Sequence, residues 1–338
     1  MNVLVTGGAG FIGSNFVRHL FKSQADAKIT NFDKLTYAGN AENLADIADD
    51  PRYQFVRGDI ADREAVEGVF GTWFDAIVHF AAETHVDRSI EDAAPFLRTN
   101  VAGTYCLLEA ARRFGTPRFI HISTDEVYGS APSGATFTEE SVLHPGSPYA
   151  ASKAAAEHLV TAYANTYGTC GVILRCSNNY GPFQFPEKLI PLMISNASDG
   201  KRLPIYGDGL HEREWLFVED YCRAIALAML KARGGSVYNV SPGKPQDNLS
   251  TVRLILRQME KPASLIEFVK DRPGHDRRYA MDSSRIRVDL DWEPKVEFEE
   301  GIRRTIAWYK ANPEWVKHAR SGEYQGYYER HYTSRGKE

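Results

Sequence analysis

The sequence of 338 residues has little cysteine: Cys106, Cys170, Cys176 and Cys222 are its only thiols, and none belongs to a Cys-x-x-Cys pair. So few thiols do not make a disulfide framework, and they favour reduced, buried cysteines in a cytoplasmic protein. No apolar run approaches the roughly 20 residues that span a membrane, so we expect no membrane segment. The first residues also lack the basic start and cleavage site of a secretory leader.

The chain also lacks a strong excess of either charge, with a net charge of −4. Residues 1–175 hold 14 Lys and Arg against 21 Asp and Glu, whereas the remainder holds 26 against 23. Neither half has a basic stripe, so we expect no nucleic-acid partner. The slightly basic second half suits a small anionic ligand, although an ordinary solvated surface explains it equally well.

The first half of the chain alternates short apolar runs with helical patterns. We expect strands at 2–6, 28–32, 53–57, 76–80, 118–123 and 171–175, separated by helices at 12–22, 63–70, 93–114 and 147–167. The apolar runs are nearly continuous, as in strands that are buried on both faces. This alternation predicts an α/β fold built on a Rossmann-type, doubly wound parallel sheet.

After Arg175 frequent prolines divide the chain into short pieces. A helix near 218–232 and a strand at 237–240 still resemble material of the main sheet, so we expect the chain to return once to the first domain. The sequence therefore predicts a smaller, discontinuous α/β lobe in the C-terminal half. The expected division is a first domain at 1–176 with return segments near 216–240, a second lobe at 177–215 and 241–320, and a tail at 321–338.

A glycine-rich loop follows the first predicted strand, with Gly7, Gly10 and Gly13 spaced as Gly-x-x-Gly-x-x-Gly. Such glycines allow a tight turn, close approach of a pyrophosphate and close helix–strand packing, and the helix N-terminus attracts the phosphates. Asp33 follows Gly13 by 20 residues, at the end of the second strand. A carboxylate there accepts hydrogen bonds from a ribose and repels a 2′-phosphate, so the pattern favours NAD over NADP.

Tyr149 and Lys153 lie four residues apart on a predicted helix, so both face the same side. A nearby cation lowers the pKa of a phenol and makes it a usable base. This helix follows the fifth strand, whose carboxyl end belongs to the edge where such sheets bind ligands. The position favours a catalytic pair over a chance spacing.

The fifth strand ends in Thr124, Asp125 and Glu126. A helix cap or a surface loop has no need of two adjacent carboxylates at that edge. Two carboxyls in such a place can divide acid and base roles if their surroundings separate their pKa values. The sequence leaves open which of the two holds the proton.

Together these motifs resemble the extended short-chain dehydrogenase/reductase family, and most closely its dTDP-glucose 4,6-dehydratases. The resemblance extends from Met1 to about Trp315. It is carried by the segments 33–40, 79–89, 124–126, 149–153, 177–182, 186–189, 204–207, 213–215 and 271–276. The Thr-Asp-Glu triplet discriminates, because epimerases and decarboxylases of the same fold usually lack the Asp-Glu pair.

The resemblance implies a lyase with tightly bound NAD that converts dTDP-glucose to dTDP-4-keto-6-deoxyglucose and water. It implies that Tyr149, helped by Lys153, takes the proton of the sugar 4-hydroxyl, which Thr124 orients, during oxidation at C4. Glu126 then removes the C5 proton and Asp125 protonates the departing C6 hydroxyl, before the hydride returns to C6.

The same resemblance implies an NAD-binding first domain and a second lobe that binds the nucleotide sugar. The residues implied to contact NAD are Gly7, Gly10, Phe11, Ile12, Gly13, Asp33, Lys34, Leu35, Thr36, Asp59, Ile60, Phe80, Ala81, Ala82, Thr99, Tyr149, Lys153 and Asn179. Those implied to contact the sugar nucleotide are Thr84, Thr124, Asn178, Glu187, Lys188, Leu189, Pro204, Ile205, Tyr206, Arg213, Asn248, Asp271, Arg272 and His275. Arg213 and Arg272 are suited to clamp a diphosphate.

Several alternatives remain open. The nearest rival is a nucleotide-sugar 4-epimerase or a uronate decarboxylase of the same fold, and a more distant one is a non-catalytic NAD-binding sensor. The histidine spacings fit no ligand pattern, so no metal is expected. The resemblance implies a homodimer through a four-helix interface, and the base of the nucleotide stays undetermined.

Overall fold

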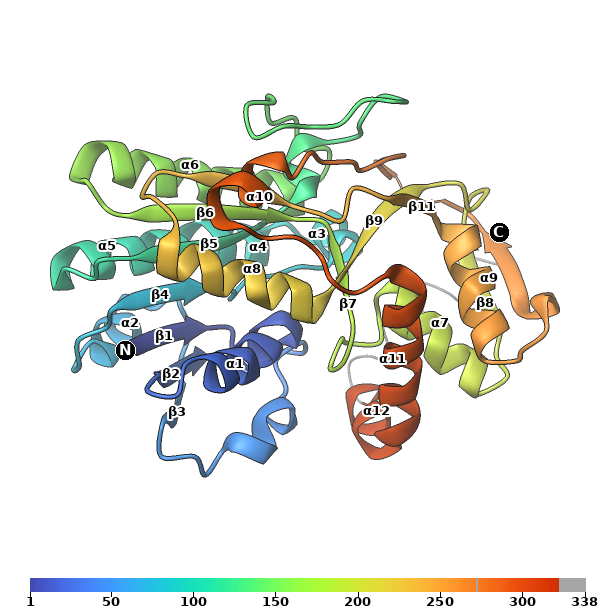
Figure 1. The fold of residues 1–338 in the computed structure, drawn as a ribbon, viewed down its shortest axis with the longest axis horizontal. Coiled ribbons are helices and arrows are strands. Elements are labelled where there is room, and N and C mark those ends of the chain that lie inside the picture. Colours follow the sequence, from blue (N-terminus) through green and yellow to red (C-terminus); the bar gives the residue numbers. More distant parts are fainter. Residues whose placement is uncertain (272, 322–338) are drawn as a thin grey trace.

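The computed structural model describes residues 1–271 and 273–321, and its centre is a seven-stranded parallel sheet (Figure 1). The strand order is β10-β6-β5-β4-β1-β2-β3, which confirms the predicted doubly wound fold. The bounds are β1 Asn2–Thr6, β2 Lys28–Asp33, β3 Tyr53–Arg57, β4 Ala76–His79, β5 Phe119–Thr124, β6 Gly171–Cys176 and β10 Val237–Val240.

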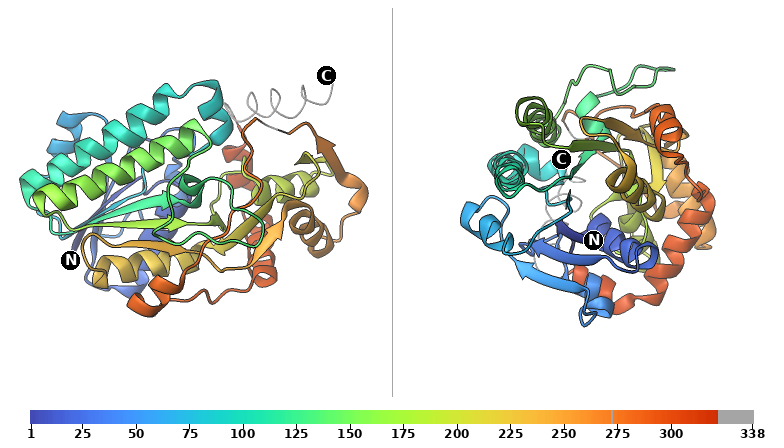
Figure 2. Two further views of the ribbon diagram at one scale, coloured as in Figure 1. Left: turned by 90° about the horizontal axis from the view of Figure 1, so that it is seen from above. Right: turned by 60° about the vertical axis from the view of Figure 1, so that its left-hand side comes forward.

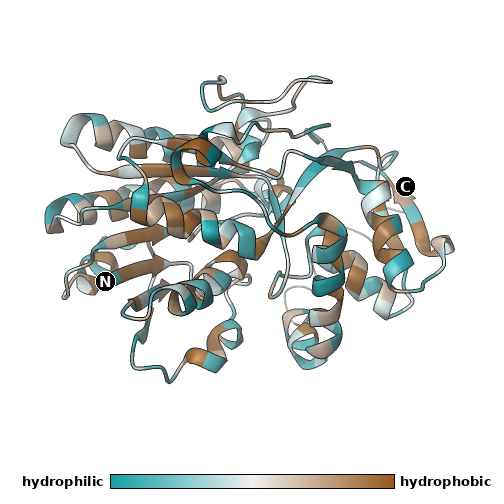
Figure 3. Cartoon of the chain, in the orientation of Figure 1, coloured by the Kyte–Doolittle hydropathy of each residue, from teal (hydrophilic) through white to brown (hydrophobic). Residues whose placement is uncertain are grey.

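Alternate residues of the strands face two separate hydrophobic cores, because successive side chains of a strand point to opposite faces. Val3 and Val5 lie in one core while Leu4 lies in the other. The strands of the sheet accordingly include many apolar residues (Figure 3). The expectation that the strands are buried on both faces was wrong for β3. It is an edge strand whose residues are half-buried or exposed, and Phe55 is 40% exposed.

Helices cover both faces of the sheet. The first face carries α1 (Phe11–Ser23), α8 (Val218–Lys231) and α10 (Ser284–Leu290), and the second carries α2 (Arg63–Val69), α5 (Thr104–Phe114) and α6 (Pro148–Tyr167). None of the helices in the described ranges 1–271 and 273–321 is both long and apolar enough to cross a membrane.

The helix expected at 93–114 consists of three segments, α4 (Ala94–Phe96), the π-helical η2 (Leu97–Gly103) and α5. Asn100 lies in the π-helical segment, and its side chain accepts from the Glu83 N–H and donates to the Glu83 carbonyl and the Ser152 hydroxyl. Wide helical turns of this kind are frequent at functional sites. Asn100 thus joins the segment after β4 to α6.

The second lobe has its own hydrophobic core, which includes Ile190, Ile205, Val252 and Ile302. A three-stranded sheet is formed by β7 (Asn178–Tyr180), β9 (Glu212–Phe217) and β11 (Pro245–Asp247), and a two-stranded sheet by β8 (Leu203–Tyr206) and β12 (Ile266–Val269). The helices of this lobe are α7 (Leu189–Ser198), α9 (Asn248–Gln258), α11 (Phe298–Ala311) and α12 (Pro313–Ala319).

The remaining short helical segments of the described chain are η1 (Ala41–Ile47), α3 (Val86–Glu91), η3 (Asp125–Tyr128) and η4 (Ala263–Leu265).

The chain returns to the first core twice. The first return is α8 and β10, near the expected segment 216–240. The second is α10 and the residues after it, since Ile286, Leu290 and Trp292 are buried in the same core as Val3. The expected division, which assigns 241–320 wholly to the second lobe, leaves this second return out, because a seven-residue helix after proline-rich loops gives little pattern. The expected tail lies outside the described residues, apart from Ser321.

Candidate active site

A cavity of about 420 Å³ lies between the two lobes, at the carboxyl ends of the parallel strands. Its lining comes from the ends of β1, β2, β4 and β5, from α6, and from β8 and β9 of the second lobe. Strand order reverses between β1 and β4, and open α/β sheets bind ligands at such a switch point.

The glycine loop connects β1 to α1 at one end of this cavity. Gly7 has a φ of +73°, and a Cβ there would lie 2.5 Å from the Ala81 backbone nitrogen. A Cβ at Gly13 would lie 2.3 Å from the Gly7 carbonyl oxygen. Gly10 is the N-cap of α1 and offers no side chain to the first N–H groups of that helix, which suits an anion at this position.

Asp33 ends β2 beside this loop. Its two carboxylate oxygens accept hydrogen bonds from the Ala9 N–H (2.9 Å) and the Leu35 N–H (2.8 Å). Burial raises the pKa of Asp33, and these two backbone bonds oppose the rise. Each oxygen keeps a further lone pair for a ribose hydroxyl. Leu35 itself does not line the cavity, and its contribution to the site is the backbone bond to Asp33.

Several polar atoms at the cavity point to a bound molecule. Ser123 Oγ, Ser177 Oγ, Asn178 Oδ1 and Asn179 Oδ1 are buried without a hydrogen-bond partner within residues 1–271 and 273–321. All four residues line the cavity, and buried polar groups without partners are costly unless a ligand or water satisfies them. With the glycine loop and Asp33, these groups fit a dinucleotide cofactor.

Tyr149 and Lys153 project from the first turns of α6, where Ser147 caps the helix and Pro148 begins it. The Lys153 ammonium donates to the Ile122 carbonyl oxygen at 2.6 Å. Burial lowers the pKa of Lys153 to about 8. The sequence predicted that the nearby Lys153 cation lowers the pKa of Tyr149, and this was wrong. The pKa of Tyr149 is raised, because burial and then the Glu126 carboxylate oppose its ionisation.

Thr124, Asp125 and Glu126 begin the short turn η3 at the end of β5. The Thr124 hydroxyl donates to Asp125 Oδ1 at 3.1 Å and accepts from the Glu126 N–H at 3.3 Å. Asp125 is 3% exposed, and burial followed by the neighbouring Glu126 charge raises its pKa well above the usual range. The structure thereby favours Asp125 as the protonated member of the pair, a choice that the sequence had left open.

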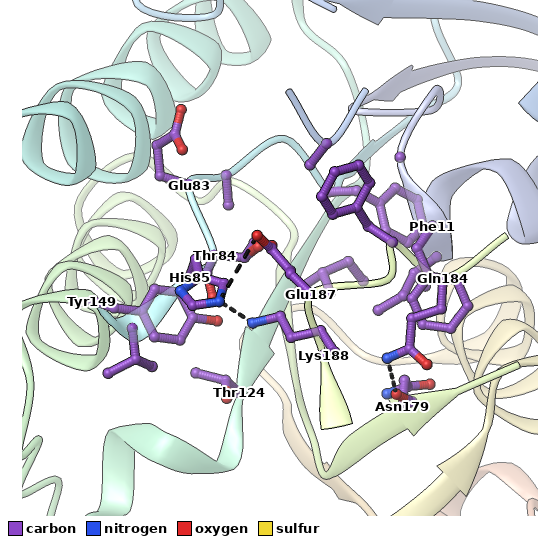
Figure 4. Close-up of a pocket in the computed structure, with 18 of the residues that line it drawn as sticks. Phe11, Glu83, Thr84, His85, Thr124, Tyr149, Asn179, Gln184, Glu187 and Lys188 are labelled. Atoms are coloured by element: carbon purple, nitrogen blue, oxygen red, sulfur yellow. Dashed lines mark hydrogen bonds and ion pairs between the residues drawn. The ribbon is translucent and has the colours of Figure 1, made fainter. Parts of the chain in front are cut away.

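The second lobe closes the cavity from the opposite side (Figure 4). Lys188 donates to the Thr84 carbonyl oxygen at 3.0 Å, and His85 Nε2 lies 3.8 Å from Glu187 Oε2. Arg213 is buried, donates to the carbonyl oxygens of Glu212 and Asp276, and lies over the Tyr279 ring. A fixed, buried guanidinium on this wall suits an anionic group of a ligand.

Most residues that the sequence singled out line this one cavity. They are Gly7, Gly10, Phe11, Ile12, Gly13, Asp33, Lys34, Thr36, Asp59, Ile60, Phe80, Ala81, Ala82, Thr84, Thr99, Thr124, Asp125, Glu126, Tyr149, Lys153, Asn178, Asn179, Glu187, Lys188, Leu189, Pro204, Tyr206, Arg213, Asn248 and His275.

Three further candidates lie outside the lining, namely Leu35, Ile205 and Asp271. Ile205 is 1% exposed and lies in the core of the second lobe, because it alternates along β8 with Pro204 and Tyr206, which do line the cavity. Arg272 lies outside the described residues.

Other lining residues had received no role from the sequence. Glu83, His85 and Asp87 belong to the conspicuous segment 79–89 but had received no role. Ser123, Cys176, Gln184, Phe185, Met193, Trp215 and Tyr279 also line the cavity. Apolar residues such as Met193 and Trp215 carry no chemical signal in sequence, since core positions share their character.

His211, Asp271 and His275 bring possible metal-ligating atoms within 4.8 Å of one another. The Asp271 carboxylate already engages His211 Nε2 at 3.2 Å and His275 Nδ1 at 2.6 Å. The two rings stack with centroids 3.9 Å apart and planes 15° apart, so their lone pairs do not converge on one point. The arrangement suits a hydrogen-bonded cluster better than a metal centre, and the absence of a metal stays a prediction.

Comparison with known proteins gives consistent matches. The family model described as GDP-mannose 4,6 dehydratase matches residues 4–305. A dTDP-glucose 4,6-dehydratase of Shigella flexneri is 47% identical, over 99% of this chain and 100% of that protein. The dTDP-glucose 4,6-dehydratase of Streptomyces venezuelae, solved with NAD bound, is 48% identical with a TM-score of 0.91, covering 94% of this chain and 100% of that one. A UDP-glucose 4-epimerase of Thermus thermophilus, also with NAD, is 32% identical with a TM-score of 0.86, covering 92% and 100%.

The stability of the folded protein depends on pH through the buried carboxyl of Glu187. Burial raises its pKa from 4.5 to about 7, while Lys188 and Arg88 oppose the rise. Between these two pH values the folded protein holds a proton that the unfolded chain has released, so this group lowers stability as the pH rises. Glu187→Gln should therefore be more stable than the parent at pH 8, by up to about 3 kcal/mol, with little difference at about pH 4.

Urea unfolding of both proteins at the two pH values measures this difference. Glu299→Gln, at a carboxyl that is 73% exposed, is the control and should give the same small change at both. A stability difference for Glu187→Gln that does not grow with pH would contradict the assignment.

Proposed function

Because the chain belongs to the GDP-mannose 4,6-dehydratase family, within the extended short-chain dehydrogenases/reductases, we propose that it converts dTDP-glucose to dTDP-4-keto-6-deoxyglucose and water. It is an NAD-dependent nucleotide-sugar 4,6-dehydratase. The observation that carries this proposal is the Asp125–Glu126 pair, of which Asp125 is buried with a raised pKa, in the cavity that also contains Tyr149 and Lys153.

When bound, NAD would accept the hydride that leaves C4 and would later donate it to C6. The chain's own part in the oxidation is proton removal. Tyr149, as its phenolate, takes the proton of the 4-hydroxyl, and the positive charge of the Lys153 ammonium on the next turn of α6 favours that phenolate against the burial that raises the pKa of Tyr149. Thr124 lies at the end of β5, where its hydroxyl can hold the 4-oxygen in place.

Water elimination needs a base for the C5 proton and an acid for the departing C6 hydroxyl. The 4-ketone acidifies the C5 proton, and Glu126 removes it. The neutral Asp125 then gives its proton to the C6 hydroxyl, which leaves as water as the C5–C6 double bond forms. Burial of Asp125 matters here, because it raises the pKa of that carboxyl well above the usual range and so favours its protonated form.

The remaining lining divides between cofactor and substrate. The glycine loop and Asp33 hold the pyrophosphate and adenosine ribose of NAD, and the two bonds that orient Asp33 support NAD over NADP. Arg213 meets the diphosphate of the sugar nucleotide, since it is the buried guanidinium on the second-lobe wall. Glu187 and Lys188 lie beside the sugar.

Two alternatives fit the observations less well. A 4-epimerase shares the fold, as the Thermus thermophilus relative does, but it has no use for a buried acid beside a carboxylate. A non-catalytic sensor needs neither the Tyr149–Lys153 pair nor the Asp125–Glu126 pair.

We also propose that the protein is a cytoplasmic homodimer. Its four cysteines are all free, which suits a reducing compartment. α5 and α6 run side by side on one outer face (Figure 2). This face and η2 carry Leu97, Tyr105 and Tyr167, which are 56%, 44% and 54% exposed. The same pair of helices from a second copy would cover these side chains and make a four-helix interface.

Incubation of the pure protein with dTDP-glucose in heavy water tests the reaction. NMR of the sugar should show a 4-keto-6-deoxy product with deuterium at C5, because the C5 proton is lost to Glu126 and replaced from solvent. A galacto product, or no turnover of any nucleotide-glucose donor, would contradict the proposal. Replacing dTDP-glucose by UDP-glucose in parallel identifies the preferred base.

Glu126→Gln separates the two halves of the reaction. The variant cannot remove the C5 proton, so water loss should slow by about 100-fold or more, while oxidation at C4 remains visible as absorbance of the reduced cofactor. Glu140→Gln, at an exposed carboxyl, is the matched control and should dehydrate normally. Full dehydration by Glu126→Gln would show that another group is the base.

Sedimentation of the purified chain measures the assembly. The parent should sediment at twice the chain mass of 37.9 kDa, and Tyr105→Arg should shift the population towards the single chain. Val288→Arg, at a position that is 83% exposed on α10, adds the same charge elsewhere and should not. A parent that sediments as a single chain at micromolar concentration would refute the dimer.

A further inference from the structure

The groups proposed for the two chemical steps lie on different elements of the chain. Tyr149 and Lys153 belong to α6, whereas Asp125 and Glu126 belong to η3. Both steps act on adjacent carbons of one sugar, so the two elements must keep a fixed separation. An error of about 1 Å between catalytic groups can cost roughly 100-fold in rate.

Glu157 continues the catalytic face of α6, since it lies four residues beyond Lys153. It is 2% exposed and forms a buried ion pair with Arg175 on β6. Arg175 Nε lies 3.0 Å from Glu157 Oε2, and one terminal nitrogen lies 2.7 Å from the same oxygen. Two nitrogens of the guanidinium are thus committed to α6.

The remaining terminal nitrogen of Arg175 faces η3. It donates to the Tyr128 hydroxyl at 2.6 Å, and Tyr128 is the last residue of η3. The Tyr128 hydroxyl donates in turn to Asn239 Oδ1 on β10 at 2.8 Å. The Tyr128 ring stacks on Phe137 with centroids 4.9 Å apart, so both ends of the side chain are fixed.

One planar cation therefore connects the element that carries the oxidation pair to the element that carries the elimination pair. Arg175 is 6% exposed and Tyr128 is 2% exposed, so water does not compete for these contacts. A buried ion pair adds little net stability compared with apolar packing, but it fixes geometry because the guanidinium is a rigid fork.

We propose that Arg175 is a positioning residue for this reaction, which sets the separation of the two catalytic pairs through its contacts with Glu157 and Tyr128. The inference rests on the proposed function. Arg175 does not line the cavity and acts through the elements that do. Neither it nor its two partners had been singled out from the sequence as site residues.

The same cluster influences the charge of Lys153. Burial lowers the pKa of Lys153 to about 8, and the Glu157 carboxylate opposes that change. The other titratable groups near Lys153 are Tyr149 on the preceding turn of α6, Cys176 on β6, His79 on β4 and His121 on β5. Burial raises the pKa of Tyr149 and of Cys176 and lowers the pKa of both imidazoles, so all four groups are neutral near pH 7. Glu157 is thus the acidic group that keeps Lys153 protonated.

Tyr128→Phe tests the link to η3. It removes the hydroxyl that accepts from Arg175 but keeps the ring that stacks on Phe137. In single-turnover experiments with dTDP-glucose, cofactor reduction should stay within about twofold of the parent, whereas product formation slows by about tenfold, so the reduced cofactor accumulates. Tyr238→Phe, which removes the hydroxyl that contacts Asp289 from another buried tyrosine, on β10, should leave both rates unchanged.

Glu157→Gln tests the link to α6 by its pH profile. The oxidation step fails as Lys153 loses its proton, and loss of the carboxylate lowers the pKa of Lys153 further. The alkaline limb of the cofactor-reduction rate should therefore move to lower pH by about one unit, whereas Glu157→Asp, which keeps the charge, should leave it in place.

These outcomes separate the inference from the function. If the parent does not dehydrate dTDP-glucose, the proposed function fails and Tyr128→Phe has no step to alter. If the parent dehydrates it but Tyr128→Phe slows both steps equally, or the limb of Glu157→Gln does not move, the positioning role is refuted. Should Glu157→Gln fail to fold, the ratio of the two rates in Tyr128→Phe decides alone.

Discussion

The structure depends on one constraint of parallel sheets: every strand of the main sheet ends at the same edge. That edge collects groups that are far apart in sequence, from Gly7 after β1 to Asp33 at the end of β2 and Thr124 at the end of β5. The strand order reverses between β1 and β4, and the second lobe covers the cavity at that edge. The proposed dinucleotide site and the proposed catalytic groups therefore share one cavity.

Burial at this edge then gives similar side chains different properties. Asp125 and Glu126 are neighbours in sequence, yet Asp125 is 3% exposed with its pKa raised well above the usual range, whereas Glu126 is half-buried. Lys153 is moved in the opposite sense, because burial penalises the charged form of either type of group. A carboxyl with a raised proton affinity and an ammonium with a reduced one follow from the same desolvation.

The sequence predicted the first half of the fold within one or two residues at most element ends, because apolar runs such as 2–6 and 171–175 are continuous and clearly bounded. It predicted little of the second lobe, where α7, α9 and α11 follow short proline-broken segments. For the site, chemically distinctive residues such as Asp33 and Tyr149 were found. Met193 and Trp215 were missed because their contribution is shape, and the raised pKa of Tyr149 was missed because burial depends on the whole fold.

The two returns of the chain to the first core have a consequence for biosynthesis. The face of the sheet that carries Val3 and Val5 is covered by Tyr221 and Ile225 of α8 and by Ile286 of α10. A nascent chain emerging from the ribosome therefore exposes the part of that apolar face that α1 does not cover until most of the polypeptide has been made, and the missing contacts are of high sequence separation. Folding of the cofactor-binding half must wait for translation of the other half, so truncation after residue 176 should yield an aggregation-prone fragment rather than an independent domain.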